Sequence, residues 1–474
     1  MYRTKDGLVF KTKPWKHQLA ALRYLMQPEH SSAALLLKMG AGKTKIWIDL
    51  INNMNFGLTL IVCPFKATRV WVNQFPTHSA DQSIFVCDLS KYSSNDKITT
   101  MKEHLKNRKS GKIVYIINYD SVWREPFRSY IKDKVKFDAI ICDESHRIKS
   151  PSSKVSRFMQ VLGRRCDHRY IATGTLLAQT PLDVYAQYRF MNPDIFGTNY
   201  ENFCSRYTKV DVYKTMRLGY TVLDEKEPYV NLEDLRERIM SCAFSVDPDL
   251  HLPPERDILI DFDLSPKAVR MYKDIQREGA LDLEKGTMEI NNALSLVLRL
   301  QQLASGFIQL EDDYGNHSIE VIDESRCRAL EDLLLDLSIG EPVVVFAKFT
   351  QDIKNIRRVC TDTGRTFSEI SGRVDEFDDW NSGKTSVLIV QIQSGAEGLD
   401  FTRAKYAIYY TLTHTLWQYN QSKKRLHRPG QRHPVTYYIL VGKIPKSKSI
   451  DDRILESLNR NENFIQRVMS EKSI

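Results

Sequence analysis

Apolar residues alternate along the chain between short continuous runs and helical patterns. Such runs, rich in β-branched side chains and bounded by polar or glycine-containing turns, are typical of strands buried on both faces of a parallel sheet. Two α/β units of similar build, each a doubly wound parallel sheet, account for them most simply. The runs lie at 33–37, 58–63, 112–119, 137–142 and 170–173 in the first half, and at 342–347, 386–391, 405–411 and 435–441 in the second.

A different stretch separates the two series of strands. Residues about 196–250 are polar, rich in tyrosine and helical in pattern, and predict a helical insertion. The two prolines of "HLPPERD" (251–257) then interrupt the pattern, so we place the domain boundary there. The first domain is predicted at 1–250 and the second at 251–474.

The end of the second domain carries one more helical pattern. Apolar residues recur there at the spacing of a single helical stripe and predict a C-terminal helix that packs back on the body. The stripe consists of Ile450, Ile454, Leu455 and Leu458.

Composition narrows the class of protein. Apolar content of 42% and charged content of 27% over 474 residues are those of a globular chain large enough for two domains. No apolar run approaches the roughly 20 residues that span a bilayer, and the start has no signal-type apolar core. The eight cysteines lack zinc-ligand spacing, and several lie in apolar strands. We therefore expect a cytoplasmic protein with reduced thiols. The net charge of +9 permits a polyanionic partner without requiring one.

The first chemical motif is a glycine-containing loop between a strand and a helix. "LLLKMGAGKTKIW" (35–47) contains Gly40, Ala41, Gly42, Lys43 and Thr44. Backbone N–H groups at a helix start bind phosphate oxygens, the lysine reaches the β/γ-phosphates, and the threonine hydroxyl can ligate Mg²⁺. The strict pattern has glycine at position 37, where this chain has leucine, so the motif alone is moderately specific.

A second strand end supplies carboxylates. "FDAIICDESHRIKS" (137–150) is an apolar strand that ends in Asp143 and Glu144. At the carboxyl end of a parallel strand, Asp143 can hold the Mg²⁺ shell and Glu144 can orient and deprotonate an attacking water. Both motifs in one chain indicate nucleotide hydrolysis.

These motifs together resemble a superfamily 2 helicase motor, and further stretches resemble the SWI/SNF-type ATPases in particular. "PWKHQLAALRYL" (14–25) is similar to that family's opening motif, in which the glutamine, here Gln18, reads adenine. "RYIATGTLLAQTPLDVYAQYRFMNPDIFG" (169–197) resembles its motif III, and "LPPERDILIDFDLSPKAVRMY" (252–272) its interdomain segment. The resemblance implies two RecA-like lobes with ATP and Mg²⁺ as cofactors, and DNA as partner.

The basic stretch "QSKKRLHRPGQ" (421–431) resembles the family's motif VI, whose arginines reach the nucleotide from the second lobe. On a helix, Gln421, Arg425 and Arg428 share one face, and Pro429-Gly430 would end that helix. Two guanidiniums one turn apart suit the charge of a transferring γ-phosphoryl group. For Lys423 and Lys424, a basic helix lying on DNA phosphates stays an open alternative.

Other stretches resemble the family's nucleic-acid motifs. "LIVCPFKATRVWVNQF" (60–75) resembles motif Ia, and "VFAKFTQDI" (345–353) resembles motif IV. "SGAEGLDFTRA" (394–404) resembles motif V, although Glu397 stands where many members have glycine, and Gly398 and Asp400 are expected at the nucleotide. The candidate nucleic-acid contacts are Lys66, Asn118, Tyr119, Thr350 and Ser394, and for Tyr119 packing at a strand end is the stronger alternative.

The resulting hypothesis is a monomeric ATP-dependent translocase that tracks along duplex DNA by sequence-independent backbone contacts. The compact chain resembles bacterial or phage members rather than nucleosome remodellers. A helicase that separates DNA or RNA strands shares every ATP residue, and its wedge could lie within residues 196–250. A nucleic-acid-binding regulator with a decayed motor is disfavoured, because Lys43, Glu144, Arg425 and Arg428 are all present.

Overall fold

The computed structural model of the chain divides into two compact units, residues 1–250 with 464–474 and residues 251–463. Each unit contains one large parallel sheet covered by helices on both faces. The predicted fold class is therefore confirmed. The residues that the structure describes are 1–107, 111–174, 176–177, 180–218, 221–224, 228–246, 252–284, 290–311, 317–393 and 399–469.

The first unit is built on a seven-stranded sheet with the order β5-β6-β4-β7-β8-β3-β9, in which every pair is parallel. A small antiparallel pair, β1 (Tyr2–Arg3) and β2 (Val9–Phe10), precedes it. The strands of the large sheet are β3 (Ser32–Leu36), β4 (Leu58–Cys63), β5 (Phe85–Asp88), β6 (Ile113–Asn118), β7 (Ala139–Asp143), β8 (His168–Thr173) and β9 (Ala243–Ser245).

Successive side chains of the central strands enter two separate cores, one on each face of this sheet. Leu35 and Ile61 pack with α1, α2 and α3, whereas Ala34 and Leu60 pack with α4 to α8. This explains why the central strands are continuous apolar runs. The helices are α1 (Lys16–Leu25), α2 (Lys43–Asn53), α3 (Phe65–His78), α4 (Ser94–Lys106), α5 (Tyr119–Val122), α6 (Phe127–Lys134), α7 (Lys154–Gly163) and α8 (Val184–Met191), with short 3₁₀ helices at Pro28–His30, Leu89–Lys91, Ser145–Ile148 and Pro181–Asp183.

The second unit has a six-stranded sheet with the order β10-β17-β16-β13-β15-β14, again parallel throughout. One face packs against α14 and α15, and the other against α16 and α17 through aromatic contacts such as Tyr409 with Tyr419. The strands are β10 (Glu255–Asp263), β13 (Val343–Ala347), β14 (Phe367–Ile370), β15 (Val387–Gln391), β16 (Tyr406–Tyr409) and β17 (Val435–Lys443). The helices on these faces are α14 (Ser325–Asp336), α15 (Thr350–Asp362), α16 (Phe377–Asn381) and α17 (Leu416–Leu426).

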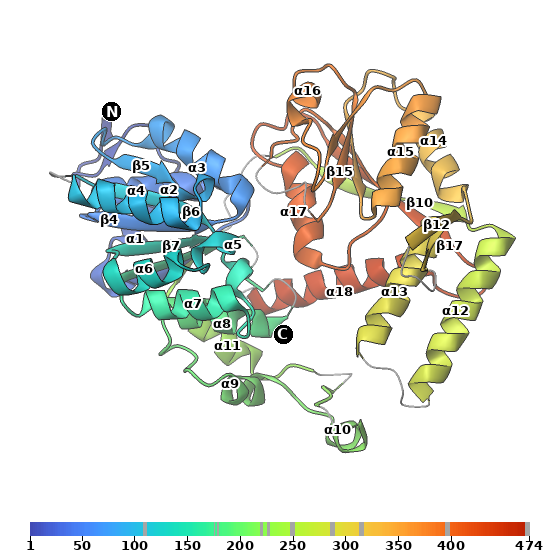
Figure 1. The fold of residues 1–474 in the computed structure, drawn as a ribbon, viewed down its shortest axis with the longest axis horizontal. Helices are drawn as coiled ribbons and strands as arrows, with labels where there is room; N and C mark the ends of the chain where they lie inside the picture. Colours follow the sequence, from blue (N-terminus) through green and yellow to red (C-terminus); the bar gives the residue numbers. More distant parts are fainter. Residues whose placement is uncertain are drawn as a thin grey trace. The chain divides into compact units, whose positions relative to one another are not determined.

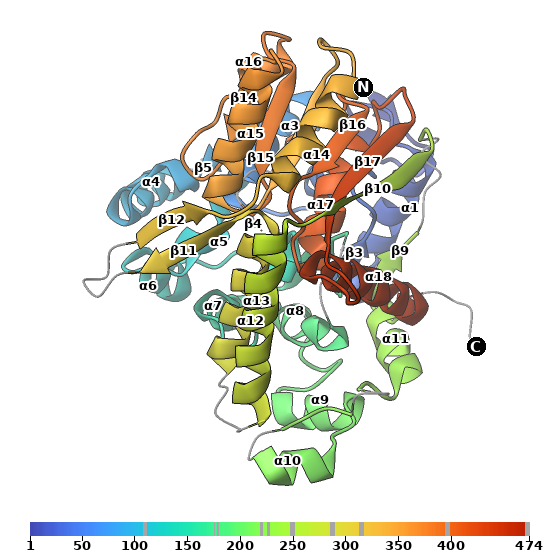
Figure 2. The same cartoon turned by 90° about the vertical axis from the view of Figure 1, so that its right-hand side faces the viewer.

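A helical pair and a hairpin extend from the second unit between β10 and α14. The long helices α12 (Pro266–Glu284) and α13 (Ile290–Ala304) lie side by side in both views (Figure 1 and Figure 2). The antiparallel strands β11 (Phe307–Glu311) and β12 (His317–Val321) follow α13 directly.

Sequence pattern identified the interior of both sheets and missed their margins. Nine predicted runs correspond to β3, β4, β6, β7, β8, β13, β15, β16 and β17. The four strands of the large sheets without such a run are β5, β9, β10 and β14, which are the four edge strands.

The predicted helical insertion needs a correction at its end. It contains α9 (Tyr200–Tyr207), α10 (Val212–Leu218) and α11 (Leu232–Met240), as expected. Residues 243–245, however, form β9, which pairs with β3 and completes the first sheet. The insertion is therefore anchored in the sheet at its far end, because three residues return to pair with the strand before the glycine-containing loop.

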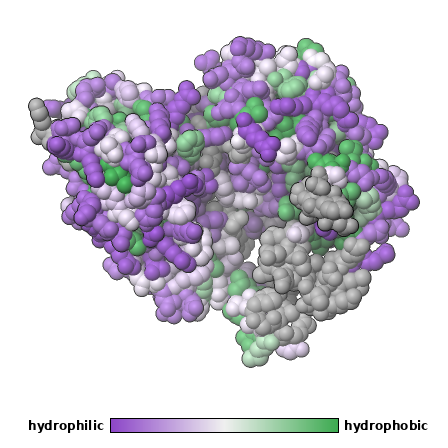
Figure 3. Space-filling model, in the orientation of Figure 1, coloured by the Kyte–Doolittle hydropathy of each residue, from purple (hydrophilic) through white to green (hydrophobic). Residues whose placement is uncertain are grey.

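The C-terminal helix is present as predicted. Helix α18 spans Ile450–Met469, and Ile450, Ile454 and Leu458 are buried, whereas Leu455 is half-buried. Within the described part of the chain, no helix is both long and apolar enough to cross a bilayer. None of the eight cysteines forms a disulfide. The face in Figure 3 is mainly hydrophilic, with hydrophobic residues scattered among polar ones.

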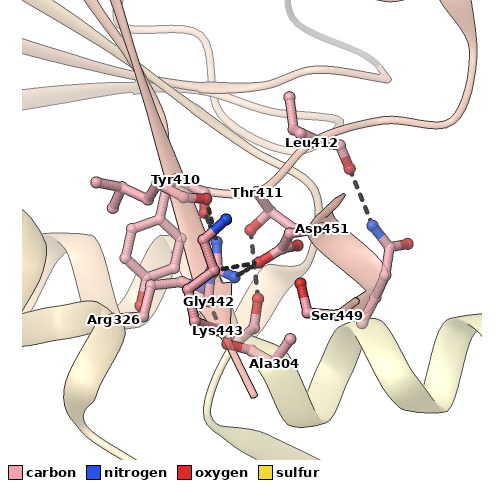
Figure 4. Close-up of polar contacts among 12 residues, drawn as sticks. Ala304, Arg326, Tyr410, Thr411, Leu412, Gly442, Lys443, Ser449 and Asp451 are labelled. Carbon is pink, nitrogen blue, oxygen red and sulfur yellow. Dashed lines mark hydrogen bonds and ion pairs between the residues drawn. The ribbon is translucent and has the colours of Figure 1, made fainter. Parts of the chain in front are cut away.

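A buried arginine connects the elements of the second unit. Arg326, at the start of α14, donates to the carbonyls of Ala304 at 3.0 Å and Leu440 at 3.3 Å and to that of Tyr410 (Figure 4). Its guanidinium also forms an ion pair with the buried carboxylate of Asp451 on α18. Asp451 accepts a further bond from the Gly442 amide at 3.0 Å. One side chain thus joins α13, α14, α18 and the ends of β16 and β17.

Removing one partner of the Arg326–Asp451 pair is expected to lower the free energy of unfolding substantially. The substitution Asp451→Asn leaves the Arg326 cation buried without its counter-charge, which typically costs about 3–5 kcal/mol. Urea denaturation would measure the loss in unfolding free energy. The matched control is the exposed pair of Lys384 with Asp379, where Asp379→Asn should leave the unfolding free energy nearly unchanged. Equal losses for the two variants would contradict the central role of Arg326.

Candidate functional site

Three neighbouring strands of the first unit, β7, β8 and β3, end at the same edge of the sheet. The register pairs Leu36 with Thr173 and Asp143 with Ala172, so the three strand ends are level. Loops at the carboxyl ends of adjacent parallel strands are the usual ligand-binding edge of such a sheet. The structure therefore brings together the "GAGKT" loop after β3, the Asp-Glu pair after β7 and the Thr-Gly pair after β8.

The "GAGKT" loop has the backbone of a phosphate-binding turn. Gly40 and Gly42 have φ of 84° and 76°, a left-handed region that glycine adopts without a Cβ clash. Helix α2 begins immediately afterwards at Lys43, with Thr44 as its second residue. The Lys43 ammonium donates to the Leu37 carbonyl at 3.0 Å, so it lies over the loop itself. Helix-start N–H groups and a lysine at one loop suit a polyphosphate.

The predicted adenine-reading residue lies beside this loop. Gln18 is buried on α1, its side-chain oxygen accepts from the Trp15 amide at 2.9 Å, and its nitrogen donates to the Ala41 carbonyl at 3.3 Å. The His17 ring bonds to the same Ala41 carbonyl at 2.8 Å. A Cβ at Gly42 would lie 2.2 Å from the Gln18 side-chain nitrogen. The Gln18 amide therefore packs directly on the second glycine of the loop.

Asp143 is held on both carboxylate oxygens. Its Oδ2 accepts from the Trp71 indole nitrogen at 2.9 Å, and its Oδ1 accepts from the Glu144 amide at 3.1 Å. The Asp143 carbonyl accepts from the Tyr119 hydroxyl at 2.8 Å. Glu144 follows with φ of 51°, a conformation that non-glycine residues rarely adopt and that clusters at functional sites. The strand end is thus fixed from three directions.

Burial sets the electrostatics of this strand end. Removal from water and the neighbouring Glu144 charge raise the pKa of Asp143 to about 6, against the lowering effect of the Lys43 cation. Burial also lowers the pKa of His146 to about 4. The His146 ring, 3.5 Å from a Glu144 carboxylate oxygen, is therefore neutral at neutral pH. It leaves the Glu144 charge uncompensated by a histidine cation.

The oxygen donors here fit Mg²⁺. A carboxylate at Asp143 and a hydroxyl at Thr44 are hard ligands, and Mg²⁺ bound together with substrate phosphates needs only one or two protein carboxylates. Among the described residues, no group of three or more His, Cys, Asp or Glu forms a metal cluster. With these oxygen donors, Asp143 and Thr44 would hold the ion.

The motif III region packs against the loop and the acidic turn. A Cβ at Gly174 would lie 3.3 Å from the Leu37 carbonyl, so only glycine fits comfortably there. Thr173 is buried, whereas Thr175 lies outside the described residues. Gln187 on α8 accepts from the Ser145 hydroxyl at 2.6 Å and donates to the Leu176 carbonyl at 2.9 Å. A fully buried amide therefore ties the turn after Glu144 to the segment after β8.

The second unit holds the predicted arginines, with one correction. Helix α17 ends at Leu426, so Arg428 lies beyond it and does not share a helical face with Gln421 and Arg425. The two guanidiniums nevertheless converge, because Arg425 and Arg428 both donate to the Leu399 carbonyl, at 3.5 and 3.4 Å.

The neighbouring motif V segment is partly described. Arg428 also forms an ion pair with Asp400 at 3.6 Å, and the Phe401 amide donates to the Arg425 carbonyl at 2.9 Å. The predicted nucleotide contact at Asp400 thus lies beside the arginines. The predicted contacts at Gly398 and Ser394 lie outside the described residues.

Two cations of the basic stretch have partners on β10. Lys423 forms an ion pair with Asp257 at 2.8 Å, and Lys424 with Glu255 at 3.5 Å. His427 bonds to the Pro253 carbonyl at 2.7 Å. The basic character of this stretch is therefore largely used to join α17 to the first strand of the second sheet.

The candidate nucleic-acid contacts divide by exposure. Thr350 is exposed at the first residue of α15, and Lys66 is half-buried in the first turn of α3. Asn118 is buried, with its side-chain oxygen accepting from the Ser121 hydroxyl. Tyr119 is buried too, and its hydroxyl is engaged by Asp143, which favours the packing alternative. Tyr119 therefore supports the acidic strand end rather than a surface.

Two residues of this site were not identified from the sequence, Trp71 and Gln187. Trp71 lies inside the stretch that resembles motif Ia, and its partner is far away in the sequence. Gln187 is an uncharged polar residue within the largely apolar helix α8, and that polarity was the signal that could have indicated it.

The contact of Gly42 with Gln18 can be tested by adding one methyl group. Gly42→Ala would push a Cβ against the Gln18 amide and strain the backbone, so we expect ATP affinity to fall. Titration with a fluorescent ATP analogue would measure it. Gly197→Ala is the matched control, because Gly197 has nearly the same φ of 75° and no atom within 4 Å of its Cβ. The interpretation fails if both variants bind the analogue like the unsubstituted protein.

Comparisons with known proteins agree with this geometry. Residues 17–306 match the SNF2-related domain, and residues 325–430 match the helicase conserved C-terminal domain. The ISWI chromatin-remodeling complex ATPase ISW1 of Saccharomyces cerevisiae is 23% identical, covering 96% of this chain and 40% of its own. The DNA repair and recombination protein RDH54 of the same yeast is 22% identical, covering 88% of this chain and 46% of its own.

A phage protein matches over nearly its whole length. Protein p41 of Acyrthosiphon pisum secondary endosymbiont phage 1 is 24% identical, covering 95% of this chain and 96% of its own. A solved structure, the Sulfolobus solfataricus SWI2/SNF2 ATPase core in complex with dsDNA, is 18% identical with a TM-score of 0.42, covering 98% of each chain. This chain spans less than half the length of the two yeast relatives. Because the SNF2-related domain alone covers more than half of it, the chain belongs to the SNF2-related family.

Proposed function

We propose that this protein is an ATP-dependent translocase that moves along duplex DNA. The observation that carries the proposal is the level ending of β3, β7 and β8, which gathers the phosphate loop, the Asp-Glu pair and the motif III glycine at one sheet edge. Family membership supports the same reaction class. The yeast relatives include a chromatin-remodeling ATPase and a DNA repair and recombination protein, which supports DNA as partner.

In this proposal the first unit binds ATP and activates water. The N–H groups at the start of α2 hold the β/γ-phosphates, Gln18 reads the adenine, and Lys43 leaves the Leu37 carbonyl for a phosphate oxygen. Mg²⁺, held by Asp143 and Thr44, would neutralise the phosphate charge. Glu144 takes a proton from the attacking water. Its neighbour His146 stays neutral because burial lowers the pKa of that ring to about 4.

The second unit supplies positive charge to the transition state. Arg425 and Arg428 converge on the Leu399 carbonyl in the structure, so the two guanidiniums lie close enough together to act on one γ-phosphoryl group. We expect both arginines to reach the nucleotide when the protein is loaded with ATP and DNA. A single chain supplies every group, so a monomer is sufficient.

DNA is expected to bind through its backbone. Lys66 and Thr350 stand at the first turns of α3 and α15, where helix-start N–H groups also favour phosphates. The net charge of +9 favours a polyanion. A helicase that separates strands would use the same ATP residues, and its substrate preference distinguishes it.

The substrate can be identified from ATP hydrolysis without nucleic acid and with single-stranded DNA, duplex DNA or RNA. Duplex DNA should raise kcat most, because a partner that favours the closed, catalytic arrangement accelerates turnover. Glu144→Gln should abolish hydrolysis in every condition and retain ATP binding. Stimulation confined to single strands or RNA would replace the translocase by a strand-separating helicase, and no hydrolysis at all would overturn the ATPase.

The arginine assignment has its own test. Arg428→Ala should lower kcat about 10³-fold or more, because arginines of this type stabilise charge that develops only in the transition state. Affinity for ADP should change little. Lys424→Ala is the control, since Lys424 is paired with Glu255 and should be dispensable for chemistry. Comparable kcat for the two variants would remove Arg428 from the mechanism.

A further inference from the structure

Trp71 is a buried residue outside the nucleotide motifs that contacts the carboxylate of the proposed metal ligand. It lies in the middle of α3, is only 1% exposed, and donates its indole N–H to Asp143 Oδ2 at 2.9 Å. Asp143 is itself buried. A hydrogen bond to an ionised carboxylate in such surroundings is stronger than a neutral one.

The indole N–H of Trp71 could serve packing alone. Buried tryptophans usually find an acceptor for their N–H, and a backbone carbonyl serves well. Trp380 in the second unit does this, because its indole N–H donates to the Ser386 carbonyl at 3.3 Å. Trp71 differs because its acceptor is a side-chain atom of the carboxylate at the end of β7.

The Trp71 bond holds the Asp143 carboxylate from an element of the fold that is distant in the sequence. Tyr119 holds the Asp143 carbonyl and therefore the backbone, and the Glu144 amide holds Oδ1 from the adjacent peptide. The remaining oxygen, Oδ2, is oriented by Trp71 from a different element. With the backbone already held, the Trp71 and Glu144 bonds together set the rotation of the carboxylate group. Outer partners of this kind orient a metal ligand and are commonly as important as the ligand itself.

We propose that Trp71 is a positioning residue that orients the Asp143 carboxylate for Mg²⁺ and so sets the affinity of the site for the ion. This inference rests on the proposed function, in which Asp143 holds the ion with the nucleotide. Trp71 belongs to α3, and Lys66 lies in the first turn of the same helix. The Trp71 bond therefore also joins the metal ligand to that helix.

The test removes the N–H and keeps most of the ring. Trp71→Phe and the control Trp380→Phe each delete one buried indole N–H. Binding of a directly excited fluorescent ADP analogue is followed as Mg²⁺ is titrated, and is repeated in EDTA. For Trp71→Phe we expect the Mg²⁺ concentration at half-maximal binding to rise about 10- to 100-fold, with binding in EDTA unchanged. Trp380→Phe should behave like the unsubstituted protein.

The Mg²⁺ dependence of ATP hydrolysis gives a second, independent test. In Trp71→Phe, ATP hydrolysis should recover toward the unsubstituted kcat as Mg²⁺ is raised, since the ligand is misoriented and still present. Phenylalanine is also smaller than tryptophan, so a second variant must keep the size of the ring. 3-Benzothienylalanine has the shape of tryptophan without its N–H, and at position 71 it should produce the same Mg²⁺ shift. The proposal is overturned if both changes leave the Mg²⁺ midpoint where it was. If the unsubstituted protein itself shows no Mg²⁺-dependent binding, the proposed function fails instead.

Discussion

The constraint on which both units depend is the parallel pairing of every strand in their large sheets. A parallel ladder forces the chain to cross back over the sheet between strands, so the helices must cover both faces. It also places the carboxyl end of every strand at one edge of the sheet. The loops at this edge lie outside the hydrogen-bonded ladder and can bind a ligand. In the first unit this geometry alone makes Leu36, Asp143 and Thr173 neighbours. Functional residues that are far apart in the sequence therefore lie together at one edge of the sheet.

Two buried carboxylates, Asp451 in the second unit and Asp143 in the first, have different partners. Arg326 and Asp451 satisfy each other and use their remaining hydrogen bonds on backbone carbonyls and an amide, so the pair acts as a joint between elements. Among the residues that the structure describes, Asp143 has no arginine or lysine ion pair of this kind, and burial raises its pKa to about 6. Its partners are neutral donors, an indole and a peptide N–H. A carboxylate left in this state is suited to a cation that arrives with a ligand, whereas the Arg326 site is already complete.

The sequence predicted the interior of the fold better than its margins for a physical reason. Central strands are covered on both faces and read as continuous apolar runs, but β5, β9, β10 and β14 are edges. Strand β10 alternates between exposed and half-buried positions, and β9 has only three residues.

The motifs predicted the positions of Gln18, Lys43, Asp143 and Glu144 in the fold, since each lies within a few residues of a recognisable strand or helix end. Trp71 was not identified, because its role comes from a contact with Asp143, which is far away in the sequence. The end of α17 was also predicted two residues too late, because the proline at 429 marks the limit of a helix rather than its last residue.

The short strand β9 changes how the segment from residue 192 to 242 can evolve. That segment leaves the body after α8 and returns as β9 beside β3, so its two ends are tied to one rigid layer. The Tyr188 hydroxyl, bonded to the Ile239 carbonyl at 2.8 Å, adds a second tie between entry and exit. Such a segment behaves as a cassette: its middle can lengthen, shorten or be exchanged while the catalytic edge keeps its shape. Differences in length and sequence among chains of this kind should therefore accumulate between α8 and β9. The conformation of the neighbouring "GAGKT" loop should not change with them.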